Sequence, residues 1–471
     1  MSSLISQKPK IINEGLEIFA NELRQVGADV IQLDWKPPGG GNMKINQKLK
    51  ELLLHKDLID AANEKAIQKV LDAQPVWVDV GLAIDMIPGF TENTFCHAGP
   101  PVTWENMCGP MQGSVIGALI YEGRAVSEAD ARKIAPAMNF VPCHQLSAVG
   151  PMTGVFSANM PVIVIQNKEN GNFAYSPFNS EGKGKPFSFG AYGEDTQETL
   201  RFLRDVMMPT LKKAINMAEG GIDLKTIIAQ ALHMGDDCHN RLIAATGQLW
   251  KSLVPELAKS GVAHDVLEQL AASIYHNNWY FLNFSMAACK ATMDAARGIP
   301  NSTLVTVMAR NGTEVGIQMS STGDRWFKMK APMVRGKYFP GYTDADANPD
   351  LGDSAITETA GIGAFAMAAA LPMTQLIGGT VEDAMRFSRE MRKITCAESR
   401  NFTIPTLEFA GTPTGIDVLK VINTGIEPII NTGIAHREAG HGIIGAGLVN
   451  MPMEVFTEAL LEFKLFEGGV T

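Results

Sequence analysis

Two strand-like runs meet at an Asn-Gly pair in the stretch Leu304-Val-Thr-Val-Met-Ala-Arg-Asn-Gly-Thr-Glu-Val-Gly-Ile-Gln-Met-Ser320. Asn-Gly supplies the positive φ that a tight two-residue turn needs, so this stretch predicts a β-hairpin. A second turn, Ser321-Thr-Gly-Asp324, leads to a third strand-like run, Arg325-Trp-Phe-Lys-Met329. The stretch therefore predicts a three-stranded meander, around which we expect the rest of the chain to be organised.

Two arginines, Arg310 and Arg325, fall near corners of this meander. A guanidinium group can hold a carboxylate or a phosphate through two parallel hydrogen bonds. We therefore expect both arginines to face one anionic ligand, with the turn residues Asn311 and Asp324 beside them.

A polar, glycine-rich loop follows the meander and enters the alanine-rich helical run at residues 364–371. The first backbone amides of a helix have no partner within the helix, so a glycine-rich helix start can bind an anion. We predict that Thr359, Gly361 and Gly363 bind a ligand in this way. The alternative is that the loop is only a surface crossover.

The alternation of helical and strand-like patterns places the chain in the α/β class, and 471 residues are too many for one ordinary core. Near the N-terminus, strands at residues 28–33 and 75–81 alternate with helices and predict a small parallel sheet. We expect four parts: an N-terminal α/β domain (1–90), the first part of a mixed-sheet domain (91–194), a helical insertion (195–298), and the second part of the mixed-sheet domain with C-terminal helices (299–471).

Within the helical insertion, amphipathic segments at residues 222–234 and 240–253 flank the corner Gly235-Asp-Asp-Cys-His239. Glycine favours a helix end and aspartate caps the next helix, so a plain capped corner is one interpretation. The mixture of titratable side chains favours a functional one. We predict catalytic roles for His233, Asp236 and His239 here, and for His144 further upstream. We expect this corner to approach residues 310–363, which places the site between the helical insertion and the sheet domain.

Three glycines, Gly109, Gly113 and Gly117, recur at four-residue intervals. In a helix they would form one bare face, which either packs closely against another backbone or cradles an anion. Spacing alone does not decide between the two.

The six cysteines include no Cys-x-x-Cys pair, which predicts reduced thiols rather than a disulfide framework. Three of them directly precede a histidine, at Cys96-His97, Cys143-His144 and Cys238-His239. Neighbouring residues rarely bind one metal together, so we expect no metal site, and a metal-dependent hydrolase or lyase remains the rival hypothesis. The run Gly39-Gly-Gly41 lacks the G-x-G-x-x-G spacing and no P-loop occurs, so no nucleotide cofactor is expected.

The overall composition limits the partners that the chain can bind. Hydrophobic residues make up 45% and charged residues 19%, as in globular proteins. A net charge of -10 and a pI near 5.5 argue against nucleic acid or an anionic membrane as a partner. We find no signal peptide or membrane-spanning run, and therefore expect a cytoplasmic protein.

Several longer motifs carry a family resemblance that covers most of the chain, from about Ile11 to Leu461. The chain resembles the bacterial YlbE/YahG-like family through Ala309-Arg-Asn-Gly-Thr313, Gly323-Asp-Arg-Trp-Phe327, Gly352-Asp-Ser-Ala-Ile-Thr-Glu-Thr359, His97-Ala-Gly-Pro-Pro101 and Gly109-Pro-Met-Gln-Gly113. One branch of that family is the AllG-type subunit of the oxamate carbamoyltransferase of anaerobic allantoin breakdown. That subunit assembles with an FdrA-like subunit similar to the acyl-CoA synthetase α chain. Other branches, the YahG-like one among them, have no such clear assignment.

The resemblance implies a carbamoyltransferase subunit that acts on small anionic substrates, carbamoyl phosphate and an oxamate-like acceptor. It also implies an FdrA-like partner and a homo- or hetero-oligomer. Because the acceptor amide is a poor nucleophile, the site needs separate anion-binding groups and a base, for which His144, His233 and His239 are candidates. Ordinary carbamoyltransferases use a Ser-x-Arg-Thr-Arg phosphate motif that this sequence lacks, so the site must differ from theirs. A non-catalytic binding or scaffold subunit is the alternative.

Overall fold

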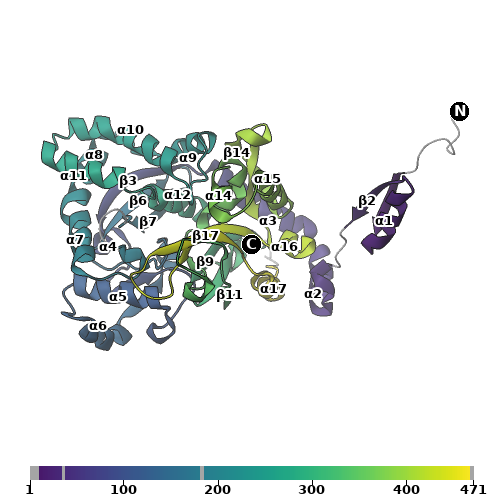
Figure 1. The fold of residues 1–471 in the computed structure, drawn as a ribbon, viewed down its shortest axis with the longest axis horizontal. Coiled ribbons are helices and arrows are strands. Elements are labelled where there is room, and N and C mark those ends of the chain that lie inside the picture. The colour runs from purple at the N-terminus through teal and green to yellow at the C-terminus, as the bar shows by residue number, and fades with distance from the viewer. Residues whose placement is uncertain (1–9, 34–37, 181–184, 467–471) are drawn as a thin grey trace, which may run out of the picture.

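The computed structural model describes residues 10–33, 38–180 and 185–466, and shows a mixed α/β protein with several small sheets (Figure 1). The predicted α/β class is confirmed. Among the described helices, none combines the length and apolarity needed to cross a membrane.

The predicted meander forms the centre of a four-stranded sheet. Its strands are β9 (Val305–Asn311), β10 (Glu314–Met319), β11 (Phe327–Lys330) and β13 (Leu351–Gly352), in the order β11-β10-β9-β13. The first connection differs from the predicted two-residue turn, because Arg310 and Val315 are the last paired residues. The Asn311 side chain accepts the amides of Thr313 and Glu314, and the positive φ falls on Gly312 (80°). A four-residue connection therefore joins the strands.

The predicted parallel pairing of strands 28–33 and 75–81 is wrong. β2 (Asp29–Leu33) pairs in parallel with β1 (Lys10–Glu14), a strand that the sequence pattern did not predict. β3 (Pro75–Leu82) instead joins an antiparallel sheet of order β7-β6-β3-β8, with β6 (Pro161–Asn167), β7 (Phe173–Pro177) and β8 (Ile222–Asp223). Helix-strand alternation alone did not specify which strands pair, and β3 satisfies its hydrogen bonds with later parts of the chain.

Three further small sheets complete the strand arrangement. β4 (Thr94–His97) and β5 (Asn139–Pro142) are parallel, and β14 (Thr395–Ile404) and β15 (Ala410–Ile416) are antiparallel. The third has the order β12-β17-β16, with β12 (Arg335–Tyr338), β16 (Ile429–Ala435) and β17 (Ile443–Asn450).

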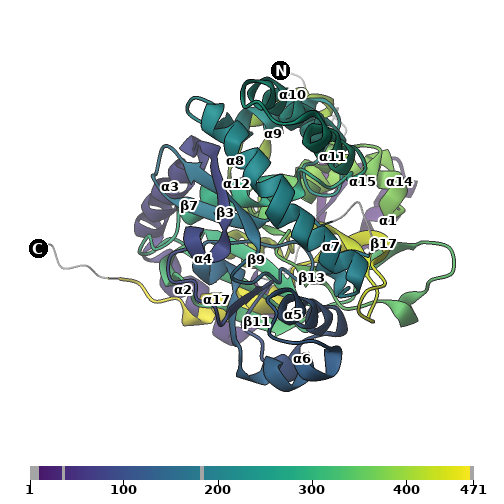
Figure 2. The same cartoon turned by 90° about the vertical axis from the view of Figure 1, so that its left-hand side faces the viewer.

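Six helices follow one another through the predicted helical stretch: α7 (Glu194–Phe202), α8 (Met208–Met217), α9 (Leu224–His233), α10 (Ile243–Lys259), α11 (His264–Tyr275) and α12 (Leu282–Asp294). Figure 2 shows α7 to α11 gathered on one side of the molecule. α12 is buried and packs on β6 and β7. The remaining α-helices are α1 (Glu17–Gln25), α2 (Met43–Leu53), α3 (Lys56–Asp72), α4 (Ala83–Met86), α5 (Gly109–Tyr121), α6 (Glu128–Ile134), α13 (Ile356–Thr359), α14 (Met373–Ile377), α15 (Val381–Glu390), α16 (Val418–Thr424) and α17 (Met453–Glu462).

Two hydrophobic cores hold the elements from α2 onward together. The first joins the helical stretch to the β3–β6 sheet, and contains Trp77 against Phe284 with ring centroids 4.8 Å apart. The second lies between the meander and helices α16 and α17, where Phe327 and Phe456 are fully buried. The predicted helical run at residues 364–371 forms mostly as a 3₁₀ helix, Gly363–Ala369.

The glycine face of α5 packs closely against other backbone. A Cβ on Gly109 would meet the carbonyl oxygen of Arg437 at 2.4 Å, and one on Gly113 would meet that of Gly190 at 2.3 Å. The glycine spacing therefore serves close packing, the first of the two interpretations given above. The loop between β16 and β17 rests on this face.

Candidate functional site

A buried segment with three carboxylates joins the elements that carry the predicted site residues. We call residues 350–363 the carboxylate segment. Its acids Asp350, Asp353 and Glu358 are at most 2% exposed, and each contacts an element far away in the sequence. Because a buried charge is unfavourable without a partner, these contacts define where the segment can lie.

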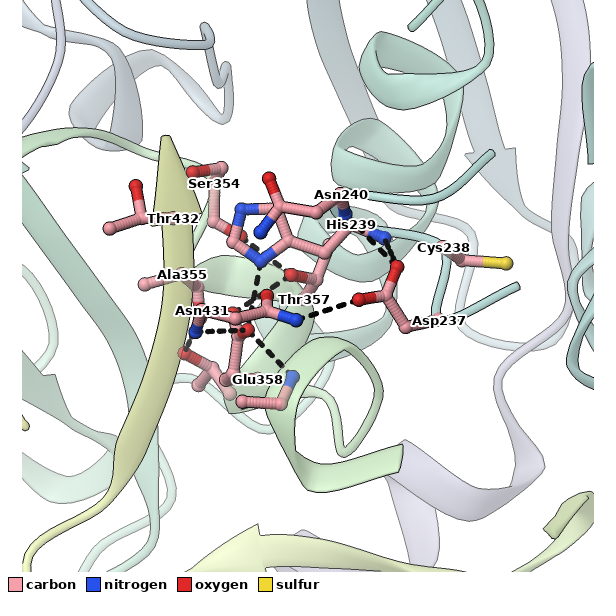
Figure 3. Close-up of polar contacts among 12 residues, drawn as sticks. Asp237, Cys238, His239, Asn240, Ser354, Ala355, Thr357, Glu358, Asn431 and Thr432 are labelled. Atoms are coloured by element: carbon pink, nitrogen blue, oxygen red, sulfur yellow. Dashed lines mark hydrogen bonds and ion pairs between the residues drawn. The ribbon is translucent and has the colours of Figure 1, made fainter. Parts of the chain in front are cut away.

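Glu358 is the acceptor at the centre of Figure 3. His239 Nδ1 lies 2.8 Å from Glu358 Oε1, and the Ala364 amide donates to the same oxygen at 2.9 Å. The Gly363 amide donates to the backbone carbonyl of Asp237 at 2.9 Å. The amides predicted to bind a ligand anion are therefore occupied by groups of this chain, and Glu358 is itself the anion at that helix start.

The other predicted residues of this loop shape the backbone. A Cβ on Gly361 would meet the Pro413 carbonyl oxygen at 2.5 Å, and one on Gly363 would meet Glu358 Oε1 at 2.3 Å. Thr359 Oγ1 donates to the Ala355 carbonyl at 2.8 Å. These three residues let the carboxylate segment turn tightly inside the protein, so this part of the loop is not a surface crossover. The earlier part of the loop, residues 341–346, does lie at the surface.

The corner between α9 and α10 does approach the carboxylate segment, as expected. Asp237 Oδ1 accepts hydrogen bonds from the amides of His239, Asn240 and Arg241, in the turn that precedes α10. The predicted capping of the next helix falls to Asp236, which accepts the Ala245 amide in the first turn of α10. Its Oδ2 accepts Asn431 Nδ2 at 2.7 Å. Between Asp237 and His239, Cys238 adopts a φ of 58°, an unfavourable conformation for a residue with a side chain. This bend belongs to the turn that holds His239 against Glu358.

Asp236 lies beneath the same corner and is fully buried. It accepts Arg241 Nη1 at 2.7 Å and the Ala245 amide at 2.8 Å. Burial nevertheless raises the pKa of Asp236 to about 6, because desolvation outweighs these contacts.

His144 faces the middle carboxylate of the segment. Asp353 accepts the amides of Gly99 at 2.8 Å and Gly150 at 3.1 Å, and His144 Nε2 lies 3.4 Å from its Oδ1. His144 is fully buried, and among the described residues neither ring nitrogen has a hydrogen-bond partner. Burial lowers the pKa of His144, which keeps the imidazole neutral at physiological pH. A neutral imidazole beside a carboxylate has the chemistry of a general base.

Two further side chains surround His144. The half-buried ring of Trp326 lies edge-on to the imidazole, with centroids 5.9 Å apart. Lys290 on α12 is fully buried, donates to Asp294 at 2.6 Å, and lies near enough to oppose protonation of His144. Burial lowers the pKa of Lys290 as well.

The expected joint clamp of Arg310 and Arg325 does not form. Consecutive turns of a meander lie at opposite ends of the middle strand, and β10 separates the two arginines. Arg310 is fully buried and donates to Asp350 Oδ2 at 2.8 Å, to the Gly352 carbonyl at 2.7 Å and to Thr432 Oγ1 at 3.1 Å. Arg310 is therefore a core residue, and its guanidinium already forms hydrogen bonds with groups of this chain.

The remaining predicted residues lie at the surface or support turns. Arg325 is exposed and pairs with Glu462 of α17, and Asp324 pairs with Arg297. His233 Nε2 lies 2.7 Å from Thr403 Oγ1, at the end of α9 and across the molecule from β11 (Figure 1). His233 and Arg325 therefore do not share a site. Asn311 is buried and donates to the Pro100 carbonyl at 2.9 Å.

One group of side chains among the described residues has the spacing of a metal site. His436, Glu438 and His441, in the loop between β16 and β17, bring their ligand atoms within 4.8 Å of one another. The two imidazole rings are stacked 4.1 Å apart, and His436 Nδ1 accepts the Glu438 amide. Lone pairs of stacked rings point in nearly parallel directions, so this arrangement would have to change before both rings could bind one ion.

Two cavities lie close to predicted site residues, one near His144 and one near Asn311. A narrow cavity of about 30 Å³, bordered by Gly154 and Asn283, has room for no more than one or two waters. A more open pocket of about 500 Å³ lies at the connection after β9, lined by Cys108, Gly312, Lys330 and Asn348 among others. Burial raises the pKa of Cys108 to about 11, so its thiol is protonated at neutral pH.

Comparison with known proteins identifies the class. A model of the oxamate carbamoyltransferase subunit AllG family matches residues 138–354. The chain is 45% identical to the uncharacterized protein YahG of Escherichia coli strain K12 over 98% of both chains. It is 44% identical to the oxamate carbamoyltransferase subunit AllG of the same strain, over 85% of this chain and 96% of that one. The chain belongs to the family of YahG and AllG.

The fold agrees with that assignment. A crystal structure of a conserved protein of unknown function from Enterococcus faecalis V583 matches with a TM-score of 0.84 and 46% identity, covering 85% of this chain and 96% of that one. The mixed α/β architecture is thus shared with a solved relative.

Sequence reasoning missed the acids and the lysine that organise this region. Asp353 and Glu358 stand in the motif Gly352-Asp-Ser-Ala-Ile-Thr-Glu-Thr359, which carries the family resemblance, but the sequence prediction assigns ligand binding to the glycines that follow them. Two acids beside glycines in an otherwise small-residue segment were the available signal. Lys290 offered a weaker one, a single cation in a run of apolar and small residues of α12.

We predict that Arg310→Ala lowers the free energy of unfolding by about 3–5 kcal/mol, because it leaves Asp350 buried without its ion partner. Arg325→Ala is the matched control, and its loss of an exposed ion pair changes stability by about 1 kcal/mol or less. Urea unfolding followed by circular dichroism measures both. Equal stability of the two variants would contradict the structural role assigned to Arg310.

We predict that Asp236 makes stability depend on pH. Its folded-state pKa is raised, so its contribution is fully present below the ordinary value of 3.8 and is lost as pH rises through about 6. The loss amounts to roughly 2–3 kcal/mol. Asp236→Asn removes this dependence between pH 4 and 6.5, whereas Asp265→Asn, at an exposed position on α11, retains it. Urea midpoints across that pH range test the difference, and parallel profiles for wild type and Asp236→Asn would refute it.

Proposed function

We propose that the chain is a carbamoyltransferase subunit, which transfers a carbamoyl group between carbamoyl phosphate and an oxamate-like acceptor. The observation that carries this proposal is the 44% identity to AllG across 96% of that protein. Among the predicted bases, His144 has the surroundings that suit the reaction best, because it is neutral, buried and next to a carboxylate.

The chemistry assigns His144 one proton transfer. The acceptor amide nitrogen forms a bond to the carbamoyl carbon, the bond from that carbon to the phosphate oxygen breaks, and phosphate leaves. The amide proton goes to His144, and Asp353 at 3.4 Å stabilises the resulting imidazolium. An amide lone pair is delocalised, so the attack depends on this proton transfer.

Trp326 is the side chain that we propose controls access to His144. Its indole lies edge-on to the imidazole and is partly exposed, so a substrate would reach His144 if this side chain rotated. The neighbouring Arg325 is exposed, and its guanidinium pairs with Glu462 of α17. Of the two arginines expected to bind the anions, only Arg325 has a guanidinium at the surface.

A second candidate function is a binding or scaffold subunit whose partner carries the chemistry. The observation that favours it is that this chain already uses its most suitable anion-binding groups internally. Arg310 binds Asp350, and the amide of Ala364 binds Glu358. Either function agrees with an FdrA-like partner, which the family resemblance implies.

We predict that His144→Asn, assayed with the FdrA-like partner, lowers kcat by about 100-fold or more while KM changes little, because it removes a general base. Wild-type kcat should stay constant on acidification until below pH 6.5, since burial lowers the pKa of His144. His233→Asn is the matched control, because His233 lies at the surface far from Asp353. A wild-type kcat in His144→Asn would overturn the assignment.

We predict that titration calorimetry separates the two functions. Carbamoyl phosphate should bind to the complex of this chain with its partner, and Arg325→Ala should weaken that binding by about 10- to 100-fold through loss of a charge-assisted contact. Size-exclusion chromatography with light scattering first establishes the complex. Affinity unchanged by Arg325→Ala, together with a kcat insensitive to His144→Asn, would favour the scaffold function.

A further inference from the structure

The N-terminal part of the chain forms a small unit that stands apart from the rest. β1, α1 and β2, residues 10–33, make up this unit, which we call the arm. Its extensive packing contacts are all internal, between β1, α1 and β2. Figure 1 shows the arm beyond α2, clearly separated from the remaining elements. The arm therefore lacks a packing partner within its own chain.

The arm is incomplete by the ordinary rules of sheet structure. Parallel sheets are normally covered on both faces, and two strands alone are barely stable in water. α1 covers one face, where Val30 is buried. The opposite face carries Ile12, Ile31 and Leu33, which are 64%, 54% and 42% exposed. α1 also leaves Phe19 and Val26 exposed. Both the sheet and the helix of the arm therefore expose apolar side chains, which another protein surface would bury.

The start of the α2–α3 helix pair offers a surface of matching character. Leu53, Leu54 and Leu58 are exposed there. Beside them a groove of about 590 Å³ opens between these helices and α16. Its apolar lining residues are Leu49, Leu52, Leu53, Ile59 and Leu419, and its charged ones are Lys50, Lys56, Lys420, Asp60 and Asp417. We call this surface the α2–α3 groove. Its lining is mainly apolar, with three lysines against two aspartates.

The charges of the two surfaces are complementary. The arm has four acids and two bases: Glu14, Glu17, Glu22, Asp29, Lys10 and Arg24. Residues 43–56, which begin the α2–α3 groove, have four lysines against the single acid Glu51. Asp60, which pairs with Lys56, and Asp417 also line the groove, so its net positive charge is small and comes mainly from the lysines of α2. Opposite charges around apolar centres steer association and disfavour other partners.

We propose that the arm of one copy docks in the α2–α3 groove of a second copy, and that the exchange is reciprocal. Every chain carries both surfaces, so two copies can satisfy both arms and both grooves about a two-fold axis. The arm of the described chain does not lie in its own groove. This arrangement predicts a dimer that depends on the first residues of the chain, and it is independent of the proposed carbamoyl transfer.

Deletion of residues 1–37 provides the first test. Sedimentation velocity should find the full chain dimeric at micromolar concentration and the shortened chain monomeric. Because the arm has no extensive contact with the rest of its chain, the shortened chain should lose only the arm's own contribution to the far-ultraviolet spectrum and should keep its melting temperature at high dilution. A full chain that is monomeric at all concentrations, with the arm folded onto its own groove or free, would overturn the proposal. A dimer that survives the deletion would overturn it too.

Charge reversal provides the second test. Lys50→Glu with Lys56→Glu should weaken the dimer by about tenfold or more, and so should Glu17→Lys with Glu22→Lys. All four substitutions in one chain should restore most of the affinity, because both surfaces then change sign together. Lys251→Glu with Lys464→Glu is a control with the same change in charge at exposed positions elsewhere. If the chain with all four substitutions loses more dimer affinity than either double variant, the arm does not bind this groove.

Discussion

The buried ion pair between Arg310 and Asp350 ties the meander to the carboxylate segment. Arg310 also donates to Gly352 and Thr432, so one guanidinium joins β9, β13 and β16. A charge pair in the interior gains little unless its geometry is good, because both ions lose their hydration. That requirement makes the contact specific even where its net contribution to stability is small. Once Asp350 is placed, Asp353 and Glu358 follow within eight residues and reach His144 and His239.

The same arrangement constrains how an anionic substrate can bind. Asp237, Asp350, Asp353 and Glu358 are all buried in this region, while Arg310 is already paired with Asp350. A carbamoyl phosphate or oxamate anion entering there would meet excess negative charge. Lys290 is a buried cation near His144, but it pairs with Asp294. Further positive charge has to come from surface residues or from another subunit. This electrostatic constraint agrees with a site completed by assembly, and it explains why the family's motif residues alone do not outline an open cleft.

Several features were predictable because they depend on residues close together in sequence. The spacing of Gly109, Gly113 and Gly117 specifies one helix face, whatever packs on it. The meander follows from alternating strand and turn signals, and the capped corner from Gly235 and Asp236. Contacts between distant residues were not predictable. Arg310 looked like a turn residue because its partner, Asp350, comes forty residues later.

The errors in predicting the site have a common physical origin. A glycine-rich helix start is expected to bind an anion, and this one does. The anion is Glu358 of the same chain rather than a ligand. Sequence patterns show which groups need a partner without showing whether the protein itself supplies it. The parallel sheet failed for a related reason, since β3 found its hydrogen-bond partners in β6 and β8.

The contact of the β16–β17 loop with the glycine face of α5 links residues more than 300 positions apart. On the ribosome, α5 and the carboxylate segment emerge well before this loop does. Until β16 is synthesised, Asp237 lacks Asn431 and the α5 glycines lack their cover. Buried polar groups of the nascent chain therefore lack some of their hydrogen-bond partners through most of translation. Contacts of such long range form only once both segments have been synthesised. Chains truncated before β16 would be left with this interior open, which makes them substrates for chaperones and proteases rather than stable fragments.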